Sequence, residues 1–183
     1  MNGEVIILTG PPGAGKTSVA ALVAGDAARP TVHLVTDSFY RAIRTGFVLP
    51  YLPESARQNE VVIDAIQAAV TAFARGGYDV VVDGIVGPWF LDPFRAAAER
   101  DHLQLSYVVL RPTLAVVLSR ARERTDDELK DIGAITGLYE EFASLDELEH
   151  HVIDTSDLDE RQAAAEVRRS VASGRYRLAR RVP

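Results

Sequence analysis

The fold is decided by one stretch near the amino terminus, GPPGAGKT at residues 10–17. It follows an apolar run at residues 5–8, which has the character of a buried strand, and precedes an alanine-rich segment at residues 18–28 with helical spacing. The stretch fits the pattern G-x-x-x-x-G-K-[ST] in the order strand, loop and helix that this pattern requires. A dinucleotide-binding fingerprint fits less well, because Ser18 stands where its third glycine belongs.

Each part of this loop predicts a contact with a phosphorylated ligand. The glycines allow the positive φ angles that gather backbone N–H groups into an anion site, and the start of the following helix adds its unpaired N–H groups. Lys16 supplies a charge for the β- and γ-phosphates, and the hydroxyl of Thr17 suits a Mg²⁺ ion. The alternative is a glycine-rich turn without a ligand, but Lys16 is one of only two lysines in the chain. The residues expected to bind the phosphates are Gly10, Pro11, Pro12, Gly13, Ala14, Gly15, Lys16, Thr17 and Ser18.

Length and composition narrow the classes of protein that remain. The 183 residues suit a single domain over residues 1–183, and the absence of cysteine excludes disulfides and thiol chemistry. A net charge of -6 argues against a nucleic-acid or anionic membrane surface. No run approaches the roughly 20 apolar residues of a membrane span, and the amino terminus lacks a signal-peptide pattern. We expect a cytoplasmic monomer or homodimer.

Strand and helix patterns alternate along the rest of the chain. This alternation predicts an α/β fold with a parallel sheet covered on both faces, whose ligands bind beyond the carboxyl ends of the strands. A polar, acidic segment at residues 125–137, which contains two glycines, is expected to be mobile. The expected strands are residues 5–8, 31–36, 78–84, 103–110 and 151–154, and the expected helices are 18–28, 39–45, 54–75, 93–101, 113–124, 138–149 and 158–173.

Asp37 directly follows the second expected strand, at the same edge of the sheet as the phosphate loop. A carboxylate at this edge suits a general base that takes the proton of a substrate hydroxyl as the oxygen attacks a γ-phosphate. The alternative is a structural role, because Asp37 also suits the N-cap of a helix beginning near Phe39.

Three further charged residues are candidates for contacts with a metal or with phosphates. Asp83 ends an apolar strand and suits a Mg²⁺ ligand, although the Asp83-Gly84 pair also suits a simple turn. Arg120 and Arg124 are i,i+4 partners that suit the stabilisation of phosphate charge, and the alternative is a solvated helix end.

Aromatic and cationic residues near the same edge suit a pocket for a small-molecule acceptor. Tyr40, Arg41 and Arg44 follow Asp37 and would orient the acceptor, with surface solvation as the alternative. The wall of the pocket is predicted to include Phe47, Tyr51, Trp89 and Phe90, with core packing as the alternative for each. The four histidines show no spacing typical of metal ligands, and we assign them no role.

Together these features resemble the small P-loop kinases, among them shikimate kinase, gluconate kinase and chloramphenicol phosphotransferase. Residues 35–38 (VTDS) are similar to the segment that carries the catalytic acid of chloramphenicol phosphotransferase, which implies that Asp37 is the base. The resemblance implies the three-layer P-loop NTPase fold, with strand order 2-3-1-4-5, a mobile lid at about residues 120–140 and an adenine-binding loop at residues 155–157. The pattern that marks shikimate recognition is missing, so the acceptor is not implied.

The resulting expectation is an ATP- and Mg²⁺-dependent kinase acting on a hydroxyl of a small molecule, such as a metabolite or an antibiotic. Lys16 and the loop would bind the phosphates, and Thr17 with Asp83 would bind the metal. An ATPase or nucleotide switch without an acceptor stays open. So does a nucleotide-binding partner protein that uses the helix at residues 54–75 as an interface, which an exposed apolar stripe would favour.

Overall fold

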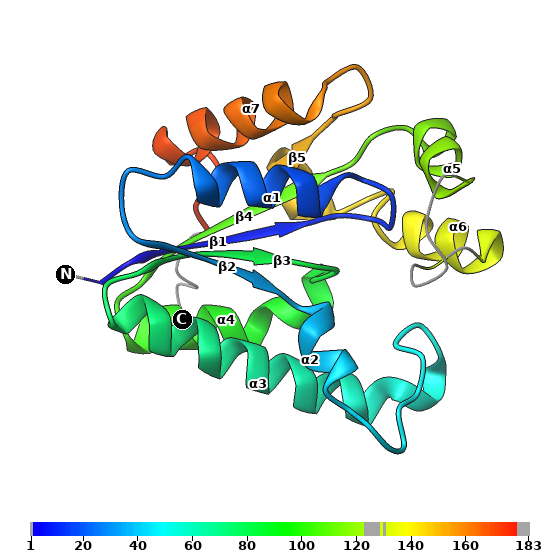
Figure 1. Ribbon diagram of the computed structural model, residues 1–183, viewed down its shortest axis with the longest axis horizontal. Coiled ribbons are helices and arrows are strands. Elements are labelled where there is room, and N and C mark those ends of the chain that lie inside the picture. Colours follow the sequence, from blue (N-terminus) through cyan, green and yellow to red (C-terminus); the bar gives the residue numbers. More distant parts are fainter. Residues whose placement is uncertain (1, 123–128, 130, 179–183) are drawn as a thin grey trace.

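The computed structural model describes residues 2–122, 129 and 131–178. Five parallel strands form one sheet in the order β2-β3-β1-β4-β5, which confirms the expected topology (Figure 1). β1 lies in the centre, so the loop that follows it emerges between β3 and β4. The strands are β1 (Glu4–Thr9), β2 (Thr31–Val35), β3 (Asp79–Asp83), β4 (Gln104–Leu110) and β5 (Val152–Ile153).

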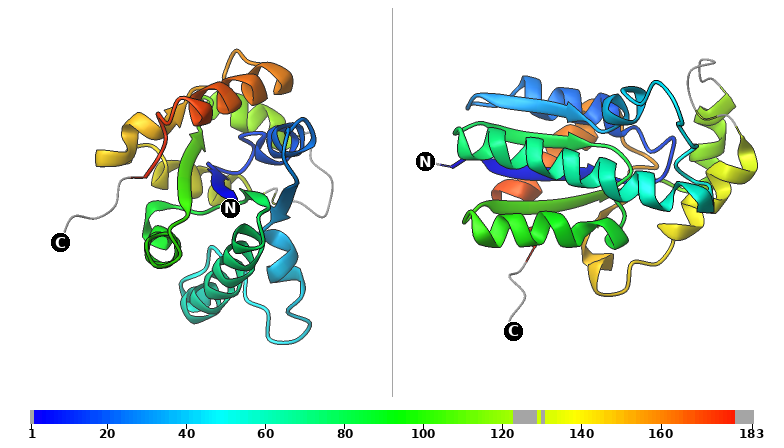
Figure 2. Two further views of the ribbon diagram at one scale, coloured as in Figure 1. Left: turned by 90° about the vertical axis from the view of Figure 1, so that its left-hand side faces the viewer. Right: turned by 90° about the horizontal axis from the view of Figure 1, so that it is seen from below.

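Helices cover both faces of the sheet. In Figure 1, α1 and α7 lie above the strands and α3 and α4 lie below them, while α5 and α6 lie beyond the carboxyl ends of the strands. Figure 2 shows the same layers end-on and from below. The α-helices are α1 (Lys16–Gly25), α2 (Asp37–Arg41), α3 (Ala56–Arg75), α4 (Leu91–Arg100), α5 (Leu114–Arg122), α6 (Ile132–Glu141) and α7 (Glu160–Ala172). Short 3-10 helices are η1 (Pro53–Ser55), η2 (Pro88–Phe90) and η3 (Asp146–His151).

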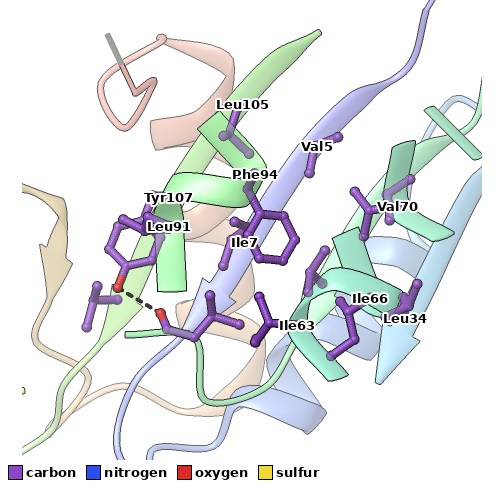
Figure 3. Close-up of a cluster of buried hydrophobic side chains, with 14 of the residues drawn as sticks. Val5, Ile7, Leu34, Ile63, Ile66, Val70, Leu91, Phe94, Leu105 and Tyr107 are labelled. Carbon is purple, nitrogen blue, oxygen red and sulfur yellow. Dashed lines mark hydrogen bonds between the residues drawn. The ribbon is translucent and has the colours of Figure 1, made fainter. Parts of the chain in front are cut away.

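Alternation of side chains along each strand divides the core around the sheet into two clusters, one on each face. In β1, Val5 and Ile7 pack toward α3 and α4, whereas Leu8 packs toward α1 and α7. Figure 3 shows the first cluster, in which Phe94 of α4 and Ile66 of α3 lie against the central strands. Burial on both faces explains why the central strands are apolar nearly throughout.

The first cluster also positions the chain that leaves β3. The buried hydroxyl of Tyr107 donates a hydrogen bond of 2.9 Å to the carbonyl of Val86, drawn as a dashed line in Figure 3. The backbone N–H of Val86 donates to Thr9 Oγ1 at 2.9 Å. These two bonds fix the start of the segment that carries Trp89 at the carboxyl edge of the sheet.

The structure corrects two boundaries in the carboxyl-terminal third. A helix at residues 138–149 is wrong, because α6 begins at Ile132 and ends at Glu141. Asp131 caps α6 by accepting a hydrogen bond from the N–H of Ala134, and fully buried Ile135 packs with Val117 of α5. The segment at residues 125–137 that was expected to be mobile therefore overlaps α6, and its residues 125–128 and 130 lie outside the described residues.

The fifth strand is also shorter than residues 151–154. It comprises Val152 and Ile153, and His151 belongs to η3. Among the helices that the structure describes, none combines the length and the apolar character of a membrane span.

Candidate functional site

The phosphate loop connects β1 to α1 and depends on its glycines. Gly10, Gly13 and Gly15 have φ angles of 142°, 84° and 84°, a region that residues with a side chain rarely adopt. A Cβ at Gly10 would also lie 2.1 Å from the carbonyl oxygen of Leu110, at the end of β4. Only glycine therefore lets the loop turn this closely over the edge of the sheet.

The loop directs donors and a cation toward one concave region. The N-cap of α1 is Gly15, and no side chain caps this helix, so its first N–H groups are available to an anion. Lys16 Nζ lies over the loop and donates to the carbonyls of Gly10 at 3.0 Å and Pro11 at 2.8 Å. Thr17 is exposed beside it. These groups can bind a polyphosphate.

A cavity of about 410 Å³ lies over this loop. Arg120 reaches it from α5, and its Nη1 lies 3.4 Å from the carbonyl oxygen of Gly13. Thr155, from the loop after β5, also lines it, and among the described residues its buried Oγ1 has no hydrogen-bond partner. The structure thus brings Arg120 and Thr155 to the phosphate loop, whereas Arg124 lies outside the described residues.

Asp83 ends β3 and is 2% exposed. Its Oδ2 lies 3.1 Å from Nε2 of His33, a residue to which the sequence assigned no role. The two side chains share the sheet face that α1 covers, because Val81 of that face pairs with His33. Asp83 is therefore a fixed carboxylate in β3 rather than part of an exposed turn.

Asp37 is the first residue of α2, and the N-cap position belongs to Thr36. No side chain makes a capping hydrogen bond at this helix, so the structural alternative for Asp37 is wrong. Burial, with a smaller effect of the Asp37 carboxylate, raises the pKa of neighbouring Tyr40 to about 12. Tyr40 therefore stays protonated at neutral pH and can donate a hydrogen bond.

A second, larger cavity of about 1310 Å³ lies beyond the carboxyl ends of β2 and β3. Asp37 lines it, and so do all the residues predicted to contact an acceptor. The cavity shares no lining residue with the first one. α6 contributes Leu138 and Glu141, and desolvation raises the pKa of Glu141. The predicted residues in the lining are Tyr40, Arg41, Arg44, Phe47, Tyr51, Trp89 and Phe90.

Two amides of α3, neither of them predicted from the sequence, hold one wall of this cavity. Gln58 pairs with the backbone of Val48 in both directions, accepting from its N–H at 2.9 Å and donating to its carbonyl at 2.7 Å. Asn59 Nδ2 donates to the carbonyl of Pro50 at 2.8 Å. The sequence did contain a signal for these two residues, because Gln58 and Asn59 stand next to each other just before an apolar run with helical spacing.

Arg111 was not predicted from the sequence either, and it anchors the chain that follows α6. Its guanidinium donates to the carbonyls of Phe142 at 2.8 Å and Ala143 at 3.1 Å, and it pairs with the carboxylate of Glu149. Tyr139 Oη donates to the carbonyl of Pro112 at 3.1 Å. These contacts fasten the carboxyl-terminal end of α6 to the end of β4.

The donor set fits a magnesium nucleotide better than a protein-only metal cage. The described residues contain no group of three or more His, Cys, Asp or Glu side chains that could hold a metal ion. Mg²⁺ is commonly bound by one or two protein oxygens together with phosphates and water. Thr17 and Asp83 are suitable oxygen ligands of this kind, on the face covered by α1.

Comparisons with solved structures show the same fold. The Deinococcus radiodurans tunicamycin resistance protein matches with a TM-score of 0.68 and 19% identity, over 97% of this chain and 99% of that one. The Mycobacterium tuberculosis APS kinase CysC, solved with AMPPNP and APS, matches with a TM-score of 0.65 and 20% identity, over 93% and 98%. A gluconokinase from Sinorhizobium meliloti matches with a TM-score of 0.60 and 18% identity, over 93% and 94%.

At the level of sequence, no curated protein matches this chain. Residues 5–142 match the family AAA_33, described as an AAA domain. This range contains the phosphate loop, Asp37, Asp83, Arg120 and the walls of the larger cavity. Since it covers more than half of the chain, the protein belongs to the AAA_33 family and has the fold of the small P-loop kinases.

Proposed function

We propose that this protein is an ATP-dependent phosphotransferase that transfers the γ-phosphoryl group to a hydroxyl of a small molecule. One observation carries the proposal: Asp37 lines a cavity of about 1310 Å³ that is separate from the cavity over the phosphate loop. An enzyme that transfers phosphate to an acceptor needs two adjoining sites and a base that faces the acceptor. A nucleotide switch needs only the first site.

In this proposal the phosphate loop and Lys16 hold the β- and γ-phosphates of ATP, and Thr155 belongs to the loop beside the adenosine. Thr17 and Asp83 would hold Mg²⁺, which neutralises charge on the phosphates. Arg120 approaches the loop from α5 and stabilises the charge on the transferred group.

The acceptor hydroxyl loses its proton to the Asp37 carboxylate as its oxygen forms a bond to the γ-phosphorus. The bond from the γ-phosphorus to the oxygen bridging the β- and γ-phosphates breaks, and ADP leaves with that electron pair. The lid at about residues 120–140, which overlaps α6, would close over both sites and exclude water, so that phosphate passes to the acceptor.

The two other classes lack comparable support. A switch or simple ATPase does not explain a second cavity beside Asp37. An interface on α3 would need an exposed apolar stripe, but the apolar face of α3 packs on the sheet. The large exposed apolar side chains of α3, Val61 and Phe73, are well separated along the helix.

The test begins with a screen of hydroxylated metabolites and antibiotics using labelled ATP. Asp37→Asn should abolish transfer to any acceptor that the wild-type protein phosphorylates, while calorimetry still detects ATP binding. Asp26→Asn, which changes an exposed carboxylate at the far end of α1, is the matched control. Turnover near the wild-type rate in Asp37→Asn would refute the base, and a wild-type protein that does not bind ATP would refute the whole proposal.

A further inference from the structure

One wall of the larger cavity is formed by large, exposed apolar side chains. Phe47 and Leu49 are each 45% exposed, Tyr51 is 36% exposed and Trp89 is 48% exposed, and all four line the cavity. Exposed apolar side chains that gather in one place mark a binding surface. The cavity also exceeds the roughly 300–1,000 Å³ typical of pockets for drug-sized ligands. The cavity is larger, and its lining more apolar, than a small polar sugar acid would require.

The part of this wall at residues 47–51 is preformed, because side chains at the start of α3 hold the backbone of that segment through hydrogen bonds. The paired bonds of Gln58 fix Val48, directly after Phe47, and the amide of Asn59 fixes Pro50, directly before Tyr51. Ser55 Oγ, itself buried, lies 2.8 Å from the same Pro50 carbonyl. A wall held in this way loses little entropy when a ligand covers it, which favours tight binding of an apolar group.

Charges around the cavity are balanced. Arg41 and Arg44 supply two positive charges, and Asp37 and Glu141 supply two negative charges. A site for an acceptor that carries a phosphate, sulfate or carboxylate group is expected to have an excess of cations. The balance here favours an acceptor without net negative charge.

We propose, on the basis of the proposed function, that the acceptor is an uncharged hydroxylated molecule with a bulky apolar part, an aromatic ring or an aliphatic chain. The apolar part lies against the wall formed by Phe47, Leu49, Tyr51 and Trp89. The hydroxyl that receives the phosphate lies beside Asp37.

The chain offers a direct probe of this proposal, because Trp89 is its only tryptophan. Its fluorescence reports occupation of the cavity whether or not phosphate is transferred. Methyl, phenyl and hexyl β-D-glucosides present the same sugar hydroxyls with increasing apolar parts, and D-gluconate is the polar anionic comparison. We expect phenyl and hexyl glucosides to bind at least about tenfold more tightly than methyl glucoside, since each buries a large additional apolar area.

Two matched variants locate the binding. Phe47→Ser should remove most of the difference between hexyl and methyl glucosides. Phe73→Ser should keep that difference, because Phe73 is 42% exposed, close to the 45% of Phe47, but lines neither cavity of the site. Both side chains are exposed, so neither change should prevent folding, which circular dichroism would verify.

The outcomes separate this inference from the proposed function. Equal affinities across the glucosides, tighter binding of D-gluconate, or an unchanged preference in Phe47→Ser would overturn the inference. Transfer of phosphate to D-gluconate in that case would still support the kinase. Conversely, a preference for apolar glucosides that depends on Phe47, in a protein that transfers phosphate to none of the screened acceptors, would support the inference about the cavity and count against the kinase.

Discussion

His33 Nε2 and Asp83 Oδ2 lie 3.1 Å apart across neighbouring strands of the sheet. The carboxylate is 2% exposed and the imidazole is 23% exposed, so solvent has little access to this contact from the side of Asp83. A hydrogen bond to one oxygen fixes the orientation of the carboxylate and leaves Oδ1 for another partner. We therefore propose that His33 positions Asp83 for the proposed magnesium site.

Replacement of His33 should weaken the dependence of ATP binding on magnesium. In His33→Ala the Asp83 carboxylate loses its orienting donor, and we expect about a tenfold weaker effect of Mg²⁺, the size typical for partners of metal ligands. His33→Gln keeps a donor and should restore much of the effect. Calorimetric titration with ATP at several Mg²⁺ concentrations measures this, and an unaltered magnesium dependence in His33→Ala would exclude the role.

Gly84 should be irreplaceable, because Thr36 packs directly on its Cα. A Cβ at Gly84 would lie 1.8 Å from Thr36 Oγ1 and 2.7 Å from Thr36 Cβ. Gly84→Ala should therefore displace the start of α2, and with it Asp37, and cost about 1–3 kcal/mol of stability. We expect a loss of transfer to the acceptor that exceeds any loss of ATP affinity.

A matched control for this change is Gly25→Ala in α1. Nothing lies within 4 Å of a Cβ at Gly25, and its φ angle is not positive, so alanine should be neutral or stabilising there. Thermal unfolding of both variants gives the comparison. Equal melting temperatures for the two would contradict the close packing of Thr36 on Gly84.

The fold could be predicted because local signals and global topology agree. The phosphate loop fixes the first strand and helix, and apolar runs of strand length mark β2, β3 and β4. α6 could not be predicted, because Gly133 and Gly137 suggest a loop and its stability comes from Ile135 packed against α5. β5 is short because its two residues pair only with the end of β4. Such tertiary effects have no local signal.

The candidate site also contains some residues that could be predicted from the sequence and others that could not. Lys16 and Thr17 are found from a motif, and Asp37 from its place after a strand. His33 becomes visible only when the pairing of β2 with β3 sets it on the same face as Asp83. Arg111 joins residues far along the chain, Phe142 and Glu149, and no spacing rule connects them.

Arg120 should contribute to the rate of transfer more than to binding of the acceptor. It lines the cavity over the phosphate loop and reaches Gly13, so it is placed for charge that develops on the transferred group. Loss of such a donor typically lowers kcat by about 10²–10³-fold. We expect a fall of this order in Arg120→Ala.

The control for Arg120 is Arg122→Ala, an exposed arginine on the same helix that lines neither cavity. It should keep kcat within about twofold, the range of ordinary surface substitutions. Steady-state kinetics with the acceptor found in the screen measures both variants. Similar kcat values for Arg120→Ala and Arg122→Ala would remove Arg120 from the proposed mechanism.

His151 should make the stability of the fold depend on pH just below neutrality. The side chain is 2% exposed, and Nδ1 lies 2.8 Å from the carbonyl oxygen of Tyr107. Burial lowers the pKa of His151 in the folded protein below its ordinary value near 6.5. As the pH falls through about 6.5, the unfolded chain therefore takes up a proton that the folded chain does not, and the free energy of unfolding decreases.

The effect should appear as a falling melting temperature between roughly pH 7 and 5.5, a window above the main titration of carboxylates. His151→Asn removes the titrating group but keeps an amide donor for Tyr107, so its melting temperature should vary less with pH over the same window. His102→Asn, which alters an exposed histidine and leaves His151 intact, should keep the wild-type slope. A slope that is the same in wild type and His151→Asn would show that the buried imidazole does not control stability in this range.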